Sequence, residues 1–495
     1  MSTRLPLSLR FLCMVSGASI VVLTACTVGP DYQKPQADIP KHWLDDTPKQ
    51  TTRTKQNLRQ WWRGFQDKRL DWLIERALLD NLDLKAARTR IQAARAQITA
   101  TEAQRWPSVN ASSAYQRQRI SPNALLGALG SIQGGSNGKN SGLLSTLGPI
   151  GTPYNLFQAG FDASWELDFF GGIRRHEEAA EANAEAIAES LNDIQVSLGA
   201  EVARLYLELR GLQCRLGIAE DRLKTQRELN RLAEANYQEG FASALDRQRV
   251  TSELSTVKST ISPLTTQINN TRHALATLLG LPPGGLEKQL ADLPLSIPLP
   301  PRIQPGLPAE ILQRRPDIRQ AERTVAAASA AIGGAVAELF PKISLTGAAG
   351  FQSQDLSNFT SLSSGFYGFG PRISLPIFQA GRLLANINAQ EQRHKESLAL
   401  YDKTVLTALR EVEDNLASLQ GVHNQQESLE SAEQTAAKAA LTALAYYQEG
   451  EVDLQVVLDT RLTWHESREQ LIQSQLAWAT GHVALFKALG GGWGY

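Results

Sequence analysis

The placement of proline constrains the fold of this chain more than any other feature. All 22 prolines lie at or before Pro376, and none lies between Pro153 and Pro263. Proline breaks the interior of a helix, and both proline-free stretches are rich in Ala, Leu, Glu and Gln, which favour helices. We therefore predict one helix over about residues 174–238 and another over about 382–448. At 1.5 Å per residue each would be roughly 100 Å long, far longer than an average globular helix.

The two long stretches belong to an internal duplication. The sequence YQEG occurs at Tyr237–Gly240 and again 210 positions later at Tyr447–Gly450. Earlier in the two copies, Pro107 and Pro341 lie 234 positions apart. Because the offset falls along the chain, the first copy contains extra residues, largely in the Gly/Ser-rich stretch Gly127–Gly151. The repeated unit has roughly 200 residues, which excludes a solenoid of short repeats.

Each copy is expected to form a helical hairpin with a tip. YQEG closes the long helix, and Gly240 or Gly450 follows the helix end, because glycine adopts the left-handed conformation without strain. The tips are candidates for a shared contact surface. A return helix follows each long helix, and a shorter helix precedes each strand region. The return helices span about 244–279 and 454–489, and the shorter ones about 84–105 and 318–339.

Two segments in each copy alternate between apolar and polar residues. In AGFDASWELDF, residues 159–169, Phe161 and Trp165 fall on one face, and Asp162 and Glu166 fall on the other. This is the period of a β-strand. Pro371 and Pro376 suggest the bend where the last strand passes into a helix. We predict strands over about 108–117, 158–169, 342–352 and 366–376.

Four strands in one chain are too few for a membrane barrel, which begins at eight strands. Open sheet edges are not tolerated in lipid, so several chains would have to pool their strands. The prediction is a mixed fold, an α-helical barrel plus a membrane β-barrel with an apolar outside and a polar lumen. Residues 127–151 would then form an outer loop. The alternative is a lipid-anchored helical scaffold that does not span the membrane.

The N-terminal residues predict a lipoprotein signal peptide. Arg4 and Arg10 precede an apolar run, Phe11–Leu23, that is too short to span a membrane stably. The run ends in LTAC, which resembles a bacterial lipobox with Cys26 as the lipidated residue. Thr27, in that pattern, favours the outer membrane. Beyond Cys26 only Cys214 remains, so the mature chain can form no intrachain disulfide.

These landmarks divide the chain into five segments. They are the signal peptide 1–25, an N-terminal lipid-anchored segment 26–66, the first repeat 67–285, a Pro-rich linker 286–305 and the second repeat 306–495.

The composition argues against several classes of function. The 50 basic and 50 acidic side chains cancel, so nothing indicates a nucleic-acid partner. The seven histidines do not pair at metal-binding spacing, and no nucleophile elbow or nucleotide loop is present. We predict no enzymatic activity, no catalytic or metal-binding residues, and no cofactor other than the covalent lipid on Cys26. No apolar run of about 18 residues or more follows the signal peptide, which predicts no transmembrane helix.

Three stretches resemble a known family. The run LQRRPDIRQAERTVAAASAAIGGAVAELFPKISLTGAAG, Leu312–Gly350, resembles the TolC-type outer-membrane efflux family. The stretches at Cys26–Pro35 and Trp61–Leu78 resemble its NodT-like lipoprotein branch. The resemblance implies a homotrimer in the outer membrane whose chains share a twelve-strand barrel, continuous with a helical barrel in the periplasm. It implies two further partners, a periplasmic adaptor protein and an inner-membrane transporter of the RND type.

The resemblance also implies roles for the hairpin tips, which form the periplasmic mouth in this family. Family members often carry Asp two residues after the tip glycine, where this chain has Val452. Asp459 recurs in the first copy as Asp246, which suggests as an alternative that Asp459 has a structural role at the tip. Adaptor docking would fall on Tyr237, Gly240, Ala242, Ser243, Tyr447, Gly450 and Val452. A periplasmic gate would fall on Glu451, Asp453, Asp459 and Arg461.

The transported substrate stays open. The mature chain would keep no Met and one free Cys, so it offers few of the sulfur ligands that Cu(I) prefers. This argues against metal chelation by the chain but not against passive conduction of metal ions. The favoured function is passive conduction of drugs or other small molecules. The alternatives are the duct of a type I protein secretion system and a narrow-substrate exporter of metals or aromatic acids.

Overall fold

The computed structural model describes residues 27–44, 58–119, 153–290, 296–301 and 306–494. The predicted signal peptide, Cys26 and residues 127–151 lie outside these ranges, as does part of the predicted linker. The chain divides into two compact units. The sheet unit holds residues up to Tyr32 with 96–181 and 327–394, and the helical unit holds 33–95, 182–326 and 395–495.

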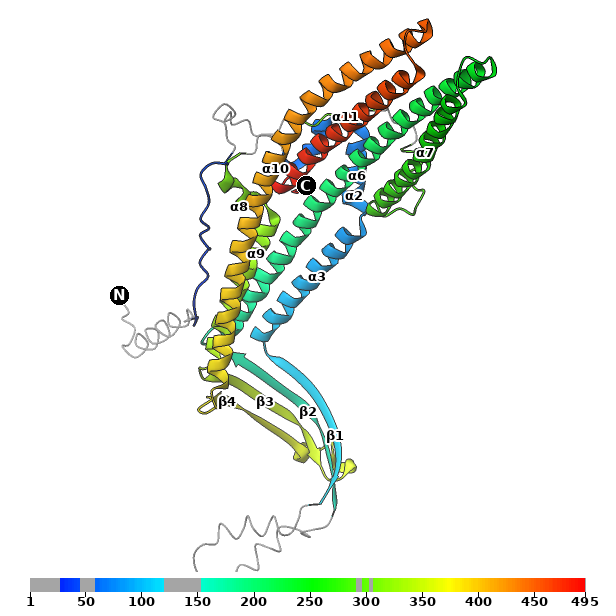
Figure 1. Ribbon diagram of the computed structural model, residues 1–495. Coiled ribbons are helices and arrows are strands. Elements are labelled where there is room, and N and C mark those ends of the chain that lie inside the picture. The colour runs from blue at the N-terminus through cyan, green and yellow to red at the C-terminus, as the bar shows by residue number, and fades with distance from the viewer. Residues whose placement is uncertain (1–26, 45–57, 120–152, 291–295, 302–305, 495) are drawn as a thin grey trace, which may run out of the picture. The chain divides into compact units, whose positions relative to one another are not determined.

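Four antiparallel strands form one sheet in the order of the sequence (Figure 1). They are β1 (Ser108–Gln118), β2 (Tyr154–Leu167), β3 (Lys342–Ser353) and β4 (Gly365–Ser374). The second strand begins at Tyr154 and not near residue 158, because Tyr154 pairs with Gln118 at the end of β1. The bend predicted at Pro371 is wrong, since β4 runs through this residue. Pro371 pairs with Leu345 of β3, so the strand pairing continues through the proline.

The strand register aligns the two faces of all four strands. Phe161 lies opposite Ala111 on β1 and Ala349 on β3. The next residue, Asp162, lies opposite Asn110, and the Asn110 side-chain amide donates to the Asp162 carboxylate at 3.2 Å. Because side chains alternate along a strand, this register gives the sheet one apolar and one polar face.

The apolar face carries large side chains that the single chain leaves uncovered. Phe161 is 64% exposed, Tyr367 83% and Phe369 87%. The outer edges of β1 and β4 pair with no other strand among the described residues. The sheet is therefore incomplete in one chain, both on its apolar face and at its two edges.

Two pairs of long helices dominate the helical unit (Figure 1). Helix α6 has 67 residues and α10 has 68, and both contribute their first turns to the sheet unit. Helix α7 continues through Pro263. The pairs are α6 (Gly172–Gln238) with α7 (Ala244–Leu278), and α10 (Arg382–Glu449) with α11 (Leu454–Ala488).

Shorter helices complete the described chain. They are η1 (Leu58–Phe65), α2 (Lys68–Asp80), α3 (Leu82–Glu102), η2 (Ala103–Arg105), η3 (Pro308–Glu310), α8 (Ile311–Arg314), α9 (Pro316–Ala337), η4 (Leu356–Asn358) and η5 (Leu362–Ser364). None of the helices in the described ranges combines the length and the apolar content that crossing a membrane requires.

The helical unit has an aromatic and aliphatic core. Trp62, Tyr206 and Phe486 are almost fully buried in it. The Tyr206 hydroxyl donates to the Asp67 carboxylate at 2.6 Å, so the buried phenol keeps a hydrogen-bond partner. Trp61 stacks on Phe486 with ring centroids 4.9 Å apart, which ties η1 to the end of α11.

Candidate functional site

Both hairpin tips close with the same backbone arrangement. Gly240 has a φ of 81° and Gly450 a φ of 79°. In the first tip the Gly240 amide donates to the Tyr237 carbonyl at 3.1 Å, and the Phe241 amide donates to the Asn236 carbonyl at 2.7 Å. The second tip repeats both hydrogen bonds around its own glycine. These bonds form a Schellman helix ending, which requires a left-handed residue and explains why both tips keep glycine.

The helices that follow the two tips begin differently. Ser243 is the N-cap of α7 and forms a capping box with Asp246. The Asp246 amide donates to the Ser243 hydroxyl at 3.1 Å, and bonds from Ser243 to the carboxylate lower the pKa of Asp246. Asp453 is the N-cap of α11, but its side chain accepts no capping hydrogen bond. The exposed Asp453 side chain therefore contributes no capping hydrogen bond to its own helix.

Asp246 and Asp459 are not structural counterparts, so the prediction that paired them is wrong. The helices begin at Ala244 and Leu454, which makes Asp246 the third residue of α7 but Asp459 the sixth residue of α11. Asp246 caps a helix, whereas Asp459 accepts a hydrogen bond from the Gln455 side chain at 2.7 Å. The sequences around the two residues are similar, but the residues lie at different distances from the start of their helices. They therefore have different hydrogen-bond partners.

The two tips contact each other within the chain. The Asn236 side-chain amide on α6 donates to the Tyr447 hydroxyl on α10 at 3.3 Å. Arg249 on α7 donates to the Gln455 side chain on α11 at 2.9 Å. Apolar side chains from all four helices form a small core between them, made of Leu229, Ala233, Val250, Ala443 and Val457.

The residues predicted for adaptor docking differ in exposure. The Tyr237 ring is exposed, with the Arg247 guanidinium carbon 4.4 Å from its centroid. Sequence analysis missed Phe241 and Leu245, which are 81% and 55% exposed beside the first tip glycine. A bulky apolar residue directly after the helix stop is the signal that could have found them. Of the remaining predicted residues, Gly240, Ser243 and Gly450 are exposed, and Ala242, Tyr447 and Val452 are partly buried.

The four residues predicted for the gate lie in the second tip and the first three turns of α11. Glu451, Asp453 and Asp459 are exposed, whereas Arg461 is partly buried. The Arg461 Nε has no hydrogen-bond partner within the described part of the chain, and burial lowers the pKa of this guanidinium. The structure thus gathers the four residues on one short segment without pairing Arg461 with any of the three acids.

One turn beyond Arg461, His465 is buried against Trp464, with ring centroids 5.1 Å apart. Burial, followed by the positive charges of Arg222 and Arg468, lowers the pKa of His465 to about 4. The imidazole is therefore neutral at pH 7.

Comparison with known proteins decides the family. The sequence model of the family described as outer membrane efflux protein matches residues 73–281 and 307–491. The chain belongs to this family. The two matched segments contain α6 with α7 and α10 with α11, so each copy of the duplication is matched.

Relatives of this outer membrane efflux protein align over nearly its whole length. The cation efflux system protein CusC of Escherichia coli is 31% identical over 481 residues, 96% of this chain and 97% of the relative. The toluene efflux pump outer membrane protein TtgF of Pseudomonas putida is 34% identical over 495 residues, 97% of this chain and 96% of the relative. The solved outer-membrane channel OprN matches with a TM-score of 0.81 at 32% identity, covering 94% of this chain and 100% of OprN. The predicted family and fold are confirmed.

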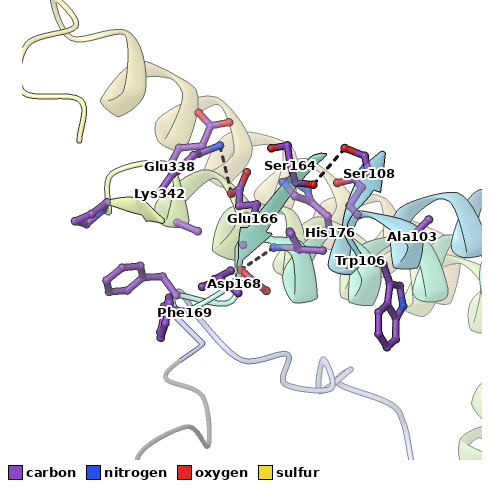
Figure 2. Close-up of a pocket in the computed structure, with 18 of the residues that line it drawn as sticks. Ala103, Trp106, Ser108, Ser164, Glu166, Asp168, Phe169, His176, Glu338 and Lys342 are labelled. Atoms are coloured by element: carbon purple, nitrogen blue, oxygen red, sulfur yellow. Dashed lines mark hydrogen bonds and ion pairs between the residues drawn. The ribbon is translucent and has the colours of Figure 1, made fainter. Parts of the chain in front are cut away.

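A cavity of about 530 Å³ lies where the sheet of this outer membrane efflux protein meets its helices (Figure 2). Glu166 and Lys342 line it from neighbouring strands, with Lys342 Nζ 4.0 Å from Glu166 Oε1. Asp168 holds the start of α6, accepting from the Ile173 amide at 3.2 Å and the Arg174 amide at 3.0 Å. Within this cavity Glu166 and Lys342 therefore face each other, and Asp168 is engaged in capping α6.

Three carboxylates of this outer membrane efflux protein approach one another within the described residues. They belong to Glu102, Glu177 and Glu181, and their oxygens lie within 4.8 Å of each other. Arg105 already forms an ion pair with the buried Glu177. The cluster is therefore partly neutralised by the protein itself, which disfavours a metal ion there.

Proposed function

We propose that three copies of this outer membrane efflux protein form the outer-membrane channel of a tripartite efflux system and conduct small molecules passively out of the cell. The observation that carries the proposal is the incomplete sheet. It has four strands, an exposed apolar face, a polar opposite face and two open edges.

The apolar face favours contact with lipid. Phe161, Tyr367 and Phe369 lie on the same face of the aligned register and would remain exposed to water in a soluble single chain. Large exposed apolar patches mark sites of protein or membrane contact. A membrane in turn requires that every strand edge be paired, and three chains with four strands each close a barrel of twelve strands.

The polar face then lines the lumen. It carries Asp162, Ser164 and Glu166 on β2, opposite polar or small residues on β1 and β3. A wide, water-filled lumen with such a lining conducts solutes without a dedicated binding pocket. This supports a conduit, and the family is one of efflux proteins, so we assign the chain no enzymatic activity.

The hairpin tips are the proposed contact with a periplasmic adaptor protein, which connects the channel to an inner-membrane transporter of the RND type. Their exposed Tyr237, Phe241 and Leu245 suit an apolar protein contact. Glu451, Asp453, Asp459 and Arg461 are the proposed gate. Threefold symmetry would bring three copies of an inward-facing carboxylate together, where they bind cations.

The proposed lipid on Cys26 anchors the chain in the outer membrane. Cys26 directly precedes Thr27, whose side chain lies close to Gly171 at the turn between β2 and α6. The Val28 amide donates to the Phe170 carbonyl at 3.2 Å, which fixes the start of the described chain at that turn.

The experiment that tests the function is a susceptibility and accumulation panel on a strain that lacks this protein. The panel covers antibiotics, dyes, metals, organic solvents and aromatic acids, and the wild-type chain is restored in a parallel strain. Sensitivity to many unrelated compounds would support a multidrug channel. Sensitivity to one class would indicate a narrow-substrate exporter, as the names of the cation and toluene efflux relatives illustrate. Unchanged accumulation of every compound would contradict an efflux function.

A further inference from the structure

Ion pairs join helix α6 of the first hairpin to helix α11 of the second. Arg215 on α6 pairs with Glu469 on α11 at 2.6 Å. Asp221 on α6 pairs with Arg468 on α11 at 3.4 Å. In these two ion pairs each arginine of the α6–α11 contact has a carboxylate from the opposite helix as its partner.

Closer to the tips, Arg461 lies in the same contact without an acid beside it. It precedes Arg468 by two turns of α11 and forms no ion pair with a carboxylate in the described part of the chain. Burial is the only influence on the pKa of its guanidinium, and it lowers that pKa, whereas a nearby carboxylate would raise it. Because arginine keeps its proton in proteins, Arg461 carries a positive charge that no described carboxylate compensates.

Two nitrogen atoms in this region are buried without a hydrogen-bond partner among the described residues. They are Arg461 Nε and His465 Nδ1. His465 is only 6% exposed, and it follows Arg461 by four residues, so both lie on the same face of α11. Three cations act on the imidazole, those of Arg222, Arg468 and Arg461, but only one acid, Asp221. Positive charge is therefore in excess around these two nitrogen atoms.

Arg461 is the source of this excess. Arg222 is neutralised by an ion pair with Glu253 of α7, and Arg468 by its ion pair with α6. We propose that Arg461 and His465 bind a small monovalent anion, such as chloride, in the contact between α6 and α11. The anion accepts hydrogen bonds from Arg461 Nε and from His465 Nδ1, which carries the proton in one tautomer of the neutral imidazole, and it compensates the charge of the guanidinium.

The burial of the two nitrogen atoms favours a small ion over a side chain from another copy. Both atoms are already inaccessible to solvent within one chain, so a carboxylate of a neighbouring chain would have to displace side chains of this one to reach them. A water molecule would accept the same hydrogen bonds but would leave the charge of Arg461 uncompensated. The anion site therefore ties the second hairpin to the first inside one chain, and it goes beyond the proposed channel.

Bromide, which replaces chloride and scatters X-rays anomalously, is the probe for the site. The full-length protein is purified in detergent, crystallised without halide and soaked in sodium bromide. We expect an anomalous peak within hydrogen-bond distance of Arg461 Nε and His465 Nδ1. A water molecule or a carboxylate of another copy at this position, in place of bromide, would overturn the proposal.

Thermal unfolding in detergent measures the same binding in solution. Sodium chloride is compared with sodium gluconate at equal ionic strength, so that charge screening is the same and only chloride is small enough for the site. Because a ligand that binds only the folded chain stabilises it, chloride should raise the unfolding midpoint of the wild-type protein by about 2 °C relative to gluconate.

A pair of variants separates the site from a general salt effect. Arg461→Gln should lose both the bromide peak and the chloride effect. Arg249→Gln is the matched control, because Arg249 also contacts α11, through Gln455, but at the surface, and it should keep both. If Arg461→Gln does not fold, His465→Phe takes its place, since it removes the Nδ1 donor and keeps an aromatic ring beside Trp464.

Two outcomes of these measurements would overturn the proposal. One is an equal chloride effect in the site variant and in Arg249→Gln. The other is a bromide peak without any chloride effect, which would mean binding at crystal concentration only. Neither outcome bears on the proposed channel, because the anion site lies within one chain.

Discussion

At the scale of single residues, the backbone angle φ should give the same glycine-to-alanine substitution opposite effects on stability at Gly450 and at Gly421. A Cβ atom at Gly450 or at Gly421 would meet no neighbour within 4 Å, but Gly450 has a φ of 79° whereas Gly421 lies inside α10. Gly450→Ala should destabilise the tip by about 1 kcal/mol, and Gly421→Ala should stabilise its helix by a similar amount. Hydrogen exchange of the Glu451 amide, which donates to the Tyr446 carbonyl, should accelerate about fivefold in Gly450→Ala only. Equal exchange in both variants would contradict this account.

His465 predicts a dependence of stability on pH. Its pKa falls from an ordinary value of 6.5 to about 4 in the folded chain, mainly because it is buried. Between these values the unfolded chain binds a proton that the folded chain does not, so stability should fall as pH drops through this window. His465→Gln should reduce the loss in unfolding midpoint between pH 7 and pH 5. His482, whose pKa burial also lowers, remains in the variant and keeps part of the effect. An identical pH dependence in both proteins would exclude His465 as a contributor.

At the scale of elements, strand β2 predicts opposite effects for charges on its two faces. Phe161 lies on the apolar face, and Ser164 lies on the polar face three residues away. An arginine facing lipid near the membrane centre costs about 2–4 kcal/mol, whereas one facing the lumen stays hydrated. Phe161→Arg should therefore reduce the amount of assembled protein in the outer-membrane fraction, and Ser164→Arg should leave it unchanged. Equal assembly of the two variants would argue against a lipid-facing β2.

At the scale of the whole molecule, we propose that the Asp453 carboxylate acts in the assembled mouth of the channel. Its side chain caps no helix, so Asp453→Ala should remove a ring of three charges with little loss of stability. We expect a higher single-channel conductance in planar bilayers, because three carboxylates that hold cations in the mouth would be absent. Ser243→Ala is the matched control, since it removes the capping box at the corresponding N-cap of α7. A conductance that rises equally in both variants would indicate a loosened tip and not a charged gate.

Much of the fold could be predicted because the features that carry it are local in the sequence. A long helix needs only the absence of proline and a supply of helix-favouring residues, and α6 and α10 meet both conditions. Alternation along β2 assigns its two faces whatever the strand pairs with. Gly240 and Gly450 mark their helix ends because a positive φ is a property of a single residue.

Other properties depend on which segments meet, and only the tertiary structure decided them. The start of β2 at Tyr154 follows from where β1 ends, and β4 continues through Pro371 because this residue pairs with Leu345 of β3. The repeat places Ser243 and Asp453 at the same N-cap position, and only the structure shows that Ser243 forms a capping box whereas the Asp453 side chain accepts no capping hydrogen bond. The sequence by itself determined the long duplicated helices, the two faces of the strands and the family to which the protein belongs. Packing between distant segments decided which side chains are engaged and which stay free, because hydrogen bonds and burial depend on neighbours in space.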